Sequence, residues 1–349
     1  MSPQRKKTTE IQNFIIQNVE DNPQNIATLV SEKFEMSRQA ASRHLRKLVE
    51  NGIIIAEGKT KNRKYILAIL DEFQMEYSLE DVEEDKVWRK DIRPHLVDAP
   101  SNVIQIFEYG VTEMINNAID HSEGKVVTIR FKRTATWADV EIQDDGVGIF
   151  NKIQEKFNLD DPRHAILELS KGKLTTDPSR HSGEGIFFTS RMVDLFSIFS
   201  GRLHLGHIAK PNSVRGVDVL LDAVKIDLPG THIHLKLSLK SSRSTKDVFD
   251  YYTTKESYGF DKTIVPVFLA TYGEENLVSR SQAKRLLVRF EKFKEIMLNF
   301  DKVETIGQAF ADEIFRVFAN AHPEISLYSV NMNEQVENMI QRAKTANIE

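Results

Sequence analysis

The 349-residue sequence contains no cysteine, which excludes disulfide bonds and thiolate metal sites. It also contains no run of about 18 apolar residues, so we expect no membrane-spanning helix. The basic residues near the start are not followed by an apolar stretch, so this segment does not resemble a secretory signal. No low-complexity tract is present. These absences favour a cytoplasmic globular protein, and the length predicts two or three domains.

Charge is unevenly distributed along the chain, although the net charge is only −4. Residues 1–70 contain 12 lysines and arginines against 7 acidic residues, whereas residues 71–85 contain eight acidic residues and no lysine or arginine. A change in composition this abrupt marks a domain boundary. We therefore predict an N-terminal domain at 1–70, followed by an acidic linker and lead-in at 71–100.

Apolar spacing in the basic segment predicts three helices followed by two strands. The first helix ends at Asn22-Pro23, the second covers roughly 25–33, and Ser37 has the chemistry to cap a third that reaches Gly52. The inner stripe of the third helix consists of Ala41, Leu45 and Leu48. Two short apolar runs then flank a basic tip at 58–64, which is typical of a β-hairpin.

This order of elements resembles the winged helix-turn-helix domains of bacterial regulators. The resemblance implies that the third helix enters the major groove of DNA, where arginine and glutamine read base edges. The residues implied on that helix are Arg38, Gln39, Ser42, Arg43 and Arg46. Those implied to contact phosphate from the hairpin are Lys59, Lys61, Arg63 and Lys64. The alternative is a winged helix that contacts a protein.

Four short motifs follow one another in the middle of the chain. Helical spacing places Glu113 and Asn117 one turn apart on the same side of a helix. The alternating run 138–142 predicts a strand that leads into an Asp-Asp-Gly-Val-Gly turn at 144–148. A second glycine motif, Ser-Gly-Glu-Gly, occupies 182–185, and a Gly-Thr pair ending at Thr231 enters an apolar strand.

Together the four motifs resemble the Bergerat-fold ATPases, which include gyrase-type topoisomerases, histidine kinases, mismatch-repair ATPases and anti-sigma-factor serine kinases. The resemblance implies a central domain at 101–240 that binds ATP with Mg²⁺. It implies that Asn117 coordinates the metal, that Glu113 is the general base, and that Asp144, supported by Thr231, recognises adenine. The glycines implied to let the backbone approach the nucleotide are Gly146, Gly148, Gly183 and Gly185. Asp145 is expected to be a solvated turn residue.

The segment 150–181 lies between the two glycine motifs, where members of the family carry a mobile lid over the phosphates. Its basic residues could neutralise phosphate charge, or they could be solvated loop residues: Arg163, His164, Lys171, Lys173, Arg180 and His181. Residues 202–227 predict an additional hairpin before Thr231. A true histidine kinase is disfavoured, because the nearby His95 follows Pro94 and has no adjacent acidic residue.

The remaining segment, 247–345, alternates predicted strands and helices, which indicates a small α/β layer with partly parallel pairing. Pro266 predicts that the first of these strands is an edge strand or contains a bulge. The pattern is similar to the STAS-like domains. Phosphorylated relatives carry a serine where the helix after the central strand begins, but here the only hydroxyl nearby is Thr305, which we interpret as a helix-start residue.

We therefore predict an α+β multidomain protein with an N-terminal winged helix, a central α/β sandwich of the Bergerat ATPase type and a C-terminal STAS-like domain. The predicted function is a transcriptional regulator that uses ATP, Mg²⁺ and DNA, with ATPase activity as a conformational switch. The alternatives are a serine/threonine protein kinase that acts on a partner protein, and a non-catalytic ATP sensor. A homodimer would suit paired DNA half-sites, but no residue indicates one.

Overall fold

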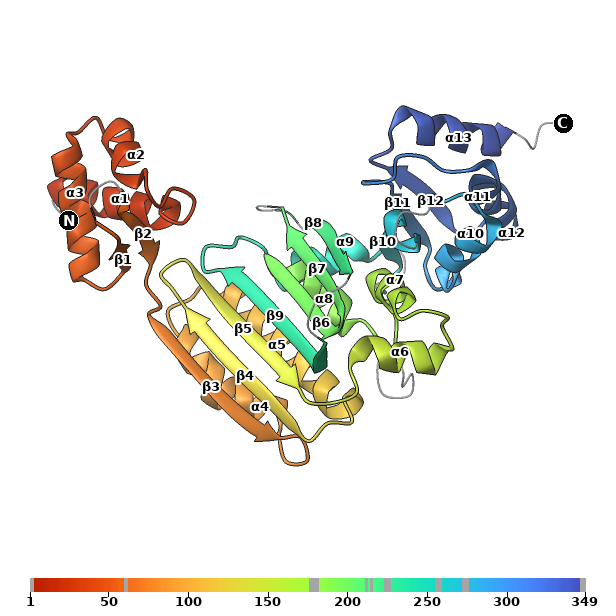
Figure 1. Ribbon diagram of the computed structural model, residues 1–349, viewed down its shortest axis with the longest axis horizontal. Coiled ribbons are helices and arrows are strands. Elements are labelled where there is room, and N and C mark those ends of the chain that lie inside the picture. The colour runs from red at the N-terminus through yellow and green to blue at the C-terminus, as the bar shows by residue number, and fades with distance from the viewer. Residues whose placement is uncertain are drawn as a thin grey trace.

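The structure is a computed structural model that describes residues 3–59, 62–175, 182–210, 213, 216–222, 227–254, 259–271 and 276–345. The described residues form an N-terminal unit, a central sheet backed by helices and a small C-terminal α/β unit (Figure 1). The first and last units lie at opposite ends of the central sheet. Among the described residues, none of the helices has the length and apolar character that a membrane span requires.

The N-terminal unit consists of three helices and an antiparallel hairpin: α1 (Pro3–Asn18), α2 (Ile26–Lys33), α3 (Arg38–Glu50), β1 (Ile54–Glu57) and β2 (Lys64–Leu67). Ser37 caps α3 by accepting a hydrogen bond from the amide of Ala40, as its position in the sequence predicts. Ala41, Leu45 and Leu48 are buried in a core shared by the three helices and the hairpin.

One side chain of the central unit, Trp137, packs against the N-terminal core. Its indole nitrogen donates to the carboxylate of Glu20, at 2.9 and 3.2 Å from the two oxygens. Lys236 lies 4.0 Å above the centre of the indole ring, so a cation stacks on the same residue. Trp137 is thus a point of contact between the N-terminal unit and the sheet.

The central sheet has seven antiparallel strands in the order β3-β4-β5-β9-β6-β7-β8. Its strands are β3 (Asp71–Ser78), β4 (Val126–Arg133), β5 (Trp137–Asp144), β6 (Leu195–Gly201), β7 (Leu203–Ala209), β8 (Gly216–Asp222) and β9 (Leu228–Ser238). Alternate residues of β4 and β5 are buried, so one face of the sheet carries the core. The hairpin predicted before Thr231 is β7 and β8 at the sheet edge.

The acidic stretch after residue 70 is an edge strand rather than a linker. Residues 71–78 form β3, which pairs with β4 along its whole length. Its acidic residues Glu72 and Glu76 are exposed, whereas Phe73 and Tyr77 pack against the core of the sheet. Charged side chains on an edge strand discourage pairing with other chains, which is a physical reason for the acidic composition.

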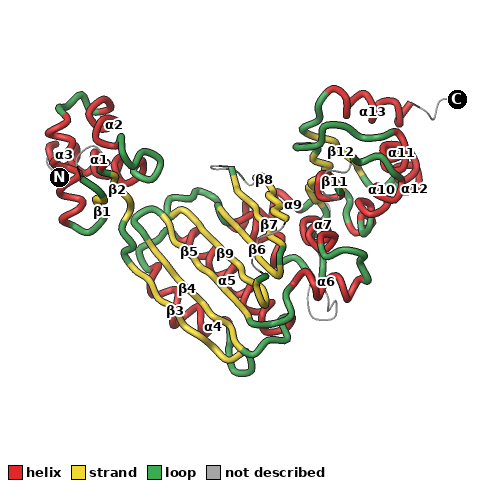
Figure 2. The backbone as a smooth tube through the Cα atoms, viewed as in Figure 1, coloured by secondary structure: helices red, strands yellow, loops and turns green. Residues whose placement is uncertain are grey.

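Helices cover one face of the sheet and leave the other face open (Figure 2). The long helix α5 (Ser101–His121) packs against β5, β9 and α8 (Gly185–Met192). It is preceded by a short helical stretch made of α4 (Glu84–Val87), a π-helical turn (Trp88–Ile92) and a 3₁₀ turn (Arg93–Leu96). Two further helices, α6 (Ile149–Phe157) and α7 (Arg163–Lys171), lie between β5 and α8 in the sequence.

The C-terminal unit has a three-stranded parallel sheet with β11 in the centre. Its elements are β10 (Lys262–Pro266), a 3₁₀ turn (Val267–Ala270), α10 (Arg280–Leu287), a 3₁₀ turn (Phe290–Lys292), β11 (Glu295–Asn299), α11 (Gln308–Asp312), a π-helical segment (Glu313–Phe318), α12 (Ala319–Ala321), β12 (Ser326–Val330) and α13 (Glu334–Thr345). Pairing is entirely parallel, and Pro266 ends an edge strand, as its ring requires.

Two helices of the C-terminal unit differ from the prediction. The spacing of Ala283, Leu286, Leu287 and Phe290 predicts a helix over 281–293. The observed helix, α10, ends at Leu287, because Arg289 adopts a left-handed backbone with φ of 66°. The next helix begins at Gln308 with Gly307 as its N-cap. Thr305 therefore lies before the helix and is not its first residue, so the interpretation of Thr305 as a helix-start residue is corrected.

A single apolar core runs from the central sheet into the C-terminal unit. Phe187 and Phe188 of α8 pack against Tyr252 at the end of α9 (Thr245–Tyr252) and against Phe260, just before β10. Phe260 in turn contacts the ring of Phe293. Because the helix that follows the second glycine motif shares this core, the C-terminal unit is packed onto the central one.

Candidate functional site

A cleft of about 1120 Å³, part of it open to solvent, lies between α5, α6 and the start of α8, with the ends of β5 and β9 as its floor. Six of the residues predicted for the site line this cleft: Glu113, Asn117, Asp144, Gly183, Gly185 and Thr231. They come from segments as far apart as α5 and β9, so the fold brings together what the sequence separates by more than a hundred positions. Ligand sites are concave clefts of this kind, with mostly apolar walls and a few polar groups.

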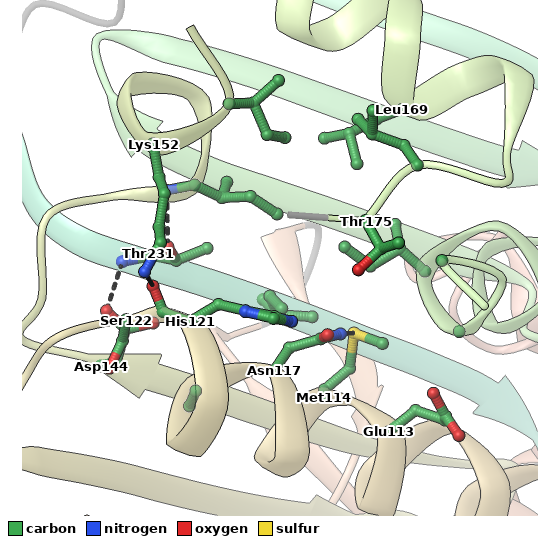
Figure 3. Close-up of a pocket in the computed structure, with 18 of the residues that line it drawn as sticks. Glu113, Met114, Asn117, His121, Ser122, Asp144, Lys152, Leu169, Thr175 and Thr231 are labelled. Atoms are coloured by element: carbon green, nitrogen blue, oxygen red, sulfur yellow. Dashed lines mark hydrogen bonds between the residues drawn. The ribbon is translucent and has the colours of Figure 1, made fainter. Parts of the chain in front are cut away.

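Helix α5 presents one side of three successive turns to the cleft (Figure 3). Glu113, Asn117 and His121 follow one another at intervals of four, which aligns their side chains along the helix. Their neighbour Ile115 is fully buried and anchors the opposite side of the helix in the core. The cleft therefore has a row of a carboxylate, an amide and an imidazole on a rigid support.

The carboxylate of Glu113 lies directly against the first residue of α8. A Cβ atom built on Gly185 would be 2.0 Å from Oε2 of Glu113, so only glycine leaves room for this carboxylate. The amides in the first turn of a helix have no partner within the helix and favour a negative charge. This arrangement holds Glu113 at the positive end of α8, at one end of the cleft.

At the other end of the cleft, Asp144 is buried and held by two backbone amides. The amide of Gly146 donates to Oδ1 at 2.9 Å, and the amide of Thr231 donates to the same oxygen at 3.1 Å. The Thr231 hydroxyl accepts from the amide of Ile149 at 3.0 Å. Burial raises the pKa of Asp144 above its usual value, although these hydrogen bonds oppose the rise. Both amides donate to Oδ1, and the Thr231 side chain also interacts with this carboxylate.

The four predicted glycines divide into two pairs. Gly183 and Gly185 line the cleft, whereas Gly146 and Gly148 lie in the turn beside it and do not line it. A Cβ on Gly146 would be 2.1 Å from the carbonyl oxygen of Ser122. Gly148 has φ of 84°, and its Cβ would meet the hydroxyl of Ser200 at 2.4 Å. These two glycines allow the turn to pack against α5 and β6.

Several lining residues were not anticipated from the sequence. The apolar ones include Met114, Ile142, Ile149, Ile153, Leu169, Leu174, Ile186 and Ile233, and the polar ones include His121, Ser122, Lys152, Thr175, Ser182 and Glu184. Lys152 on α6 donates to the carbonyl of His121 at 2.7 Å and to Glu123 at 2.8 Å, which ties α6 to the end of α5. The sequence signals for these residues are the spacing of His121 from Asn117 and the place of Ser182 and Glu184 within the second glycine motif.

Of the six basic residues considered for the lid, the four described ones do not line the cleft, although Lys152 of the same segment does. Arg163 pairs with Asp161 at 3.0 Å, and His164 lies 3.3 Å from a guanidinium nitrogen of Arg285. Lys171 is completely buried, and Lys173 donates to a carbonyl of the C-terminal unit. The idea that they face phosphate is thus not supported for these four; Arg180 and His181 lie outside the described residues.

The donor set of the cleft fits a magnesium ion that arrives with a nucleotide. Among the described residues, no group of three or more His, Cys, Asp or Glu side chains is arranged to hold a metal. Magnesium in phosphate-binding sites needs only one or two protein oxygens, because phosphate and water supply the remaining ligands. The amide oxygen of Asn117 can supply one such ligand, beside the carboxylate of Glu113.

Comparison with protein families agrees with this geometry. Residues 81–204 match the family described as the histidine kinase-like ATPase domain, and this range contains the α5 row, Asp144 and the start of α8. The central unit is a histidine kinase-like ATPase domain. Residues 282–337 match a STAS-like domain of unknown function. No curated protein is significantly similar in sequence to this chain.

His95 is the nearest histidine ahead of the ATPase domain motifs and is the candidate for a phosphate acceptor. It lies in the 3₁₀ turn before α5, where its Nδ1 is 2.5 Å from Oδ2 of Asp71. Its ring also packs against Phe73 and Phe131. His95 therefore joins β3 to the core of the ATPase domain and does not line the cleft.

The basic residues predicted to contact DNA lie on the surface of the N-terminal unit. Those of α3 are all exposed: Arg38, Gln39, Ser42, Arg43 and Arg46. Lys59, Arg63 and Lys64 of the hairpin are exposed as well, and Lys64 pairs with Glu57 at 2.8 Å. Lys61 lies outside the described residues. Neither family match includes this unit, which lies ahead of the ATPase domain.

Proposed function

We propose that this protein is an ATP-binding, DNA-binding transcriptional regulator in which the ATPase domain acts as a switch. The observation that carries the nucleotide part is the meeting of Asp144, Asn117 and Glu113 along one cleft of the ATPase domain. The exposure of the predicted recognition residues on α3 supports the DNA part.

In this proposal the adenine amino group donates to Oδ2 of Asp144, while Oδ1 stays engaged with the amides of Gly146 and Thr231. An ionised carboxylate can only accept hydrogen bonds. It can therefore pair with the amino group of adenine but not with the carbonyl oxygen that guanine carries at the same ring position, so it selects adenine over guanine. Thr231 positions the turn that follows Asp144 through its bond to the amide of Ile149. The apolar lining residues exclude water from the base.

Asn117 would hold magnesium through its amide oxygen, and the ion would neutralise phosphate charge when bound. The row on α5 places Glu113 one turn from Asn117 and against the start of α8. In that position the carboxylate accepts a proton from a nucleophilic water or hydroxyl as general base. A water would make the protein an ATPase, and a hydroxyl of a partner protein would make it a serine/threonine kinase.

The N-terminal unit binds DNA with the exposed side of α3 in the major groove and with Lys59 and Arg63 on the phosphates. Trp137 connects this unit to β5 of the ATPase domain. A nucleotide can change DNA affinity only if it binds two arrangements of the units with different affinity. The Trp137–Glu20 contact is one interaction that could differ between such arrangements.

Calorimetry tests the nucleotide part. We expect wild type to bind ATP more tightly with magnesium than without it, and Asn117→Ala to lose that difference. The matched control is Asn116→Ala, because Asn116 is the adjacent residue on α5 and does not line the cleft. Equal ATP affinity for wild type and Asn117→Ala, with and without magnesium, would remove the metal assignment.

Labelled ATP distinguishes the activities. Release of free phosphate supports the ATPase, and transfer of label to a protein in a cell extract supports the kinase. In both cases Glu113→Ala should abolish turnover and retain ATP binding. If slow turnover is the same in wild type and Glu113→Ala, the protein is a non-catalytic ATP sensor.

A further inference from the structure

One described cation of the predicted lid, Lys173, is engaged on the side of the C-terminal unit. Lys173 donates to the carbonyl of Lys292 at 2.8 Å and lies 3.6 Å from Oδ1 of Asp261. Its ammonium group is also 5.5 and 5.0 Å from the ring centres of Phe260 and Phe293. Aromatic faces and a carboxylate both attract a cation. The segment after α7 is therefore attached to the STAS-like side of the molecule.

A buried ion network joins α7 itself to the end of α10. Lys171 is 0% exposed, and its ammonium donates to Oε1 of Glu168 at 2.5 Å and to the carbonyl of Val288 at 2.9 Å. Arg289 donates to the other oxygen of Glu168 at 2.7 Å. One carboxylate of α7 is thus shared between a lysine of α7 and an arginine that follows α10.

Two further hydrogen bonds fix the C-terminal end of α7. Arg289 donates to the carbonyl of Gly172 at 2.6 Å, and the buried hydroxyl of Thr263 on β10 donates to the carbonyl of Lys171 at 2.7 Å. The last carbonyls of a helix have no partner within the helix, so these donors satisfy groups that α7 cannot satisfy itself. The backbone of Arg289 is left-handed, which is an unfavourable conformation for arginine. The hydrogen bonds of its side chain offset this cost.

This network lies next to the wall of the cleft. Leu169 belongs to the same helix as Glu168 and Lys171, and Leu174 and Thr175 follow within four residues of Lys171; all three line the cleft. The amide of Leu174 also donates to the carbonyl of Gly183 at 3.2 Å, which connects this wall to the second glycine motif. Any shift of α7 against α10 would move one wall of the cleft.

We propose that Arg289 and Thr263 are positioning residues of the nucleotide site, so that the STAS-like side of the molecule determines the shape of the cleft by holding α7. This inference rests on the proposed ATP binding and names the part of the chain that regulates it. Neither residue contacts the cleft. They act by fixing α7, and a change in how the C-terminal unit packs would be transmitted to the nucleotide through that helix.

The test combines hydrogen exchange with calorimetry on the full chain. Arg289→Gln removes the partner of Glu168, and Arg280→Gln is the matched control, since Arg280 is an exposed arginine in the first turn of α10. Without nucleotide, we expect the amides of α7 to exchange faster in Arg289→Gln than in wild type or in the control. With nucleotide, we expect ATP affinity to fall on the order of tenfold, which is a typical coupling between sites.

Thr263→Val provides a milder variant that keeps every charge and nearly the same volume, in case Arg289→Gln does not fold. It should also speed exchange in α7 and weaken ATP binding, by a smaller factor. Unchanged exchange in α7 in both variants overturns the inference, and so does faster exchange with wild-type ATP affinity. If wild type binds no ATP, the proposed function fails, whereas the exchange data still report whether these residues hold α7.

Discussion

Glu113 and Gly185 lie so close that a single methyl group would not fit between them: a Cβ on Gly185 would be 2.0 Å from the Glu113 carboxylate oxygen. The first residue of α8 therefore determines where the proposed general base lies. The glycine in this motif is required by a side chain of the protein itself, in addition to any approach of a nucleotide.

We predict that Gly185→Ala displaces the carboxylate of Glu113 and lowers ATP turnover by about 100-fold or more, the usual effect of losing a general base. Nucleotide binding should fall much less, because Asp144 and Asn117 are unaffected. Phosphate release and calorimetry measure the two effects. Gly206→Ala is the control, since its nearest neighbour is a side chain 3.3 Å away on the sheet. Wild-type turnover in Gly185→Ala would contradict the role of Glu113.

A second prediction concerns acid pH. Burial raises the pKa of Asp144, so this group becomes protonated at a higher pH than an exposed aspartate. Because Oδ1 accepts two backbone amides, the added proton would sit on Oδ2, which is the proposed acceptor for the adenine amino group. ATP affinity should therefore fall on acidification before ordinary carboxylates titrate. Asp144→Asn should bind ATP more weakly, by about 1.5–3 kcal/mol for a hydrogen bond to a charged group, and should lack this pH dependence.

Calorimetry at a series of pH values separates this effect from the titration of ATP itself, because wild type and variant share the ligand. Asp145→Asn is the matched control: Asp145 is exposed and accepts from the amides of Lys125 and Val126, away from the cleft. The same pH profile for wild type and Asp144→Asn would show that Asp144 does not contact the nucleotide.

The sequence predicts the parts of the site that depend on local order. Glu113 and Asn117 are one turn apart on any helix, and Asp144 ends any strand that alternates as 138–142 does, so their placement needs no knowledge of the fold. The position of β3 was missed because its acidic residues hide an alternation in which Phe73 and Tyr77 face the core. The acidic composition of 71–78 indicated a linker, because the alternation of apolar and polar residues is a weak signal over only eight positions.

Contacts between distant segments were beyond the sequence. Glu168 and Arg289 are 121 positions apart, and neither belongs to a motif. Gly146 was recognisable as a turn glycine, but only the structure reveals that the turn packs against the carbonyl of Ser122. Lys171 was interpreted as either solvated or facing phosphate, and it is neither. The spacing of residues along α7 cannot show that the C-terminal unit will pack against this helix and bury Lys171.

The burial of Lys171 predicts a dependence of stability on alkaline pH. Burial lowers the pKa of Lys171 from 10.5 to about 8, although Glu168 opposes the shift and Arg289 adds to it. Between these two pH values the unfolded chain binds a proton that the folded chain does not, so this group makes the free energy of unfolding rise with pH. Its contribution is at most about 3 kcal/mol over the window.

Urea denaturation at several pH values measures this contribution as the difference between wild type and Lys171→Met. Methionine has a similar length and no charge, so the variant should lack the rise between about pH 8 and 10.5. The partner Glu168 keeps Arg289 in the variant. Parallel curves for the two proteins would mean that Lys171 stays charged in the folded state.

The last prediction uses two adjacent cations of the N-terminal hairpin. Arg63 and Lys64 are both exposed, but Lys64 is 2.8 Å from the carboxylate of Glu57, which already neutralises it. Each phosphate contact adds about 0.9 to the slope of log affinity against log salt concentration. Arg63→Ala should therefore lower that slope by about 1, whereas Lys64→Ala should change it much less. Fluorescence anisotropy with duplex DNA at several salt concentrations gives both slopes. Equal slopes for wild type and Arg63→Ala would place the DNA contact elsewhere on the unit.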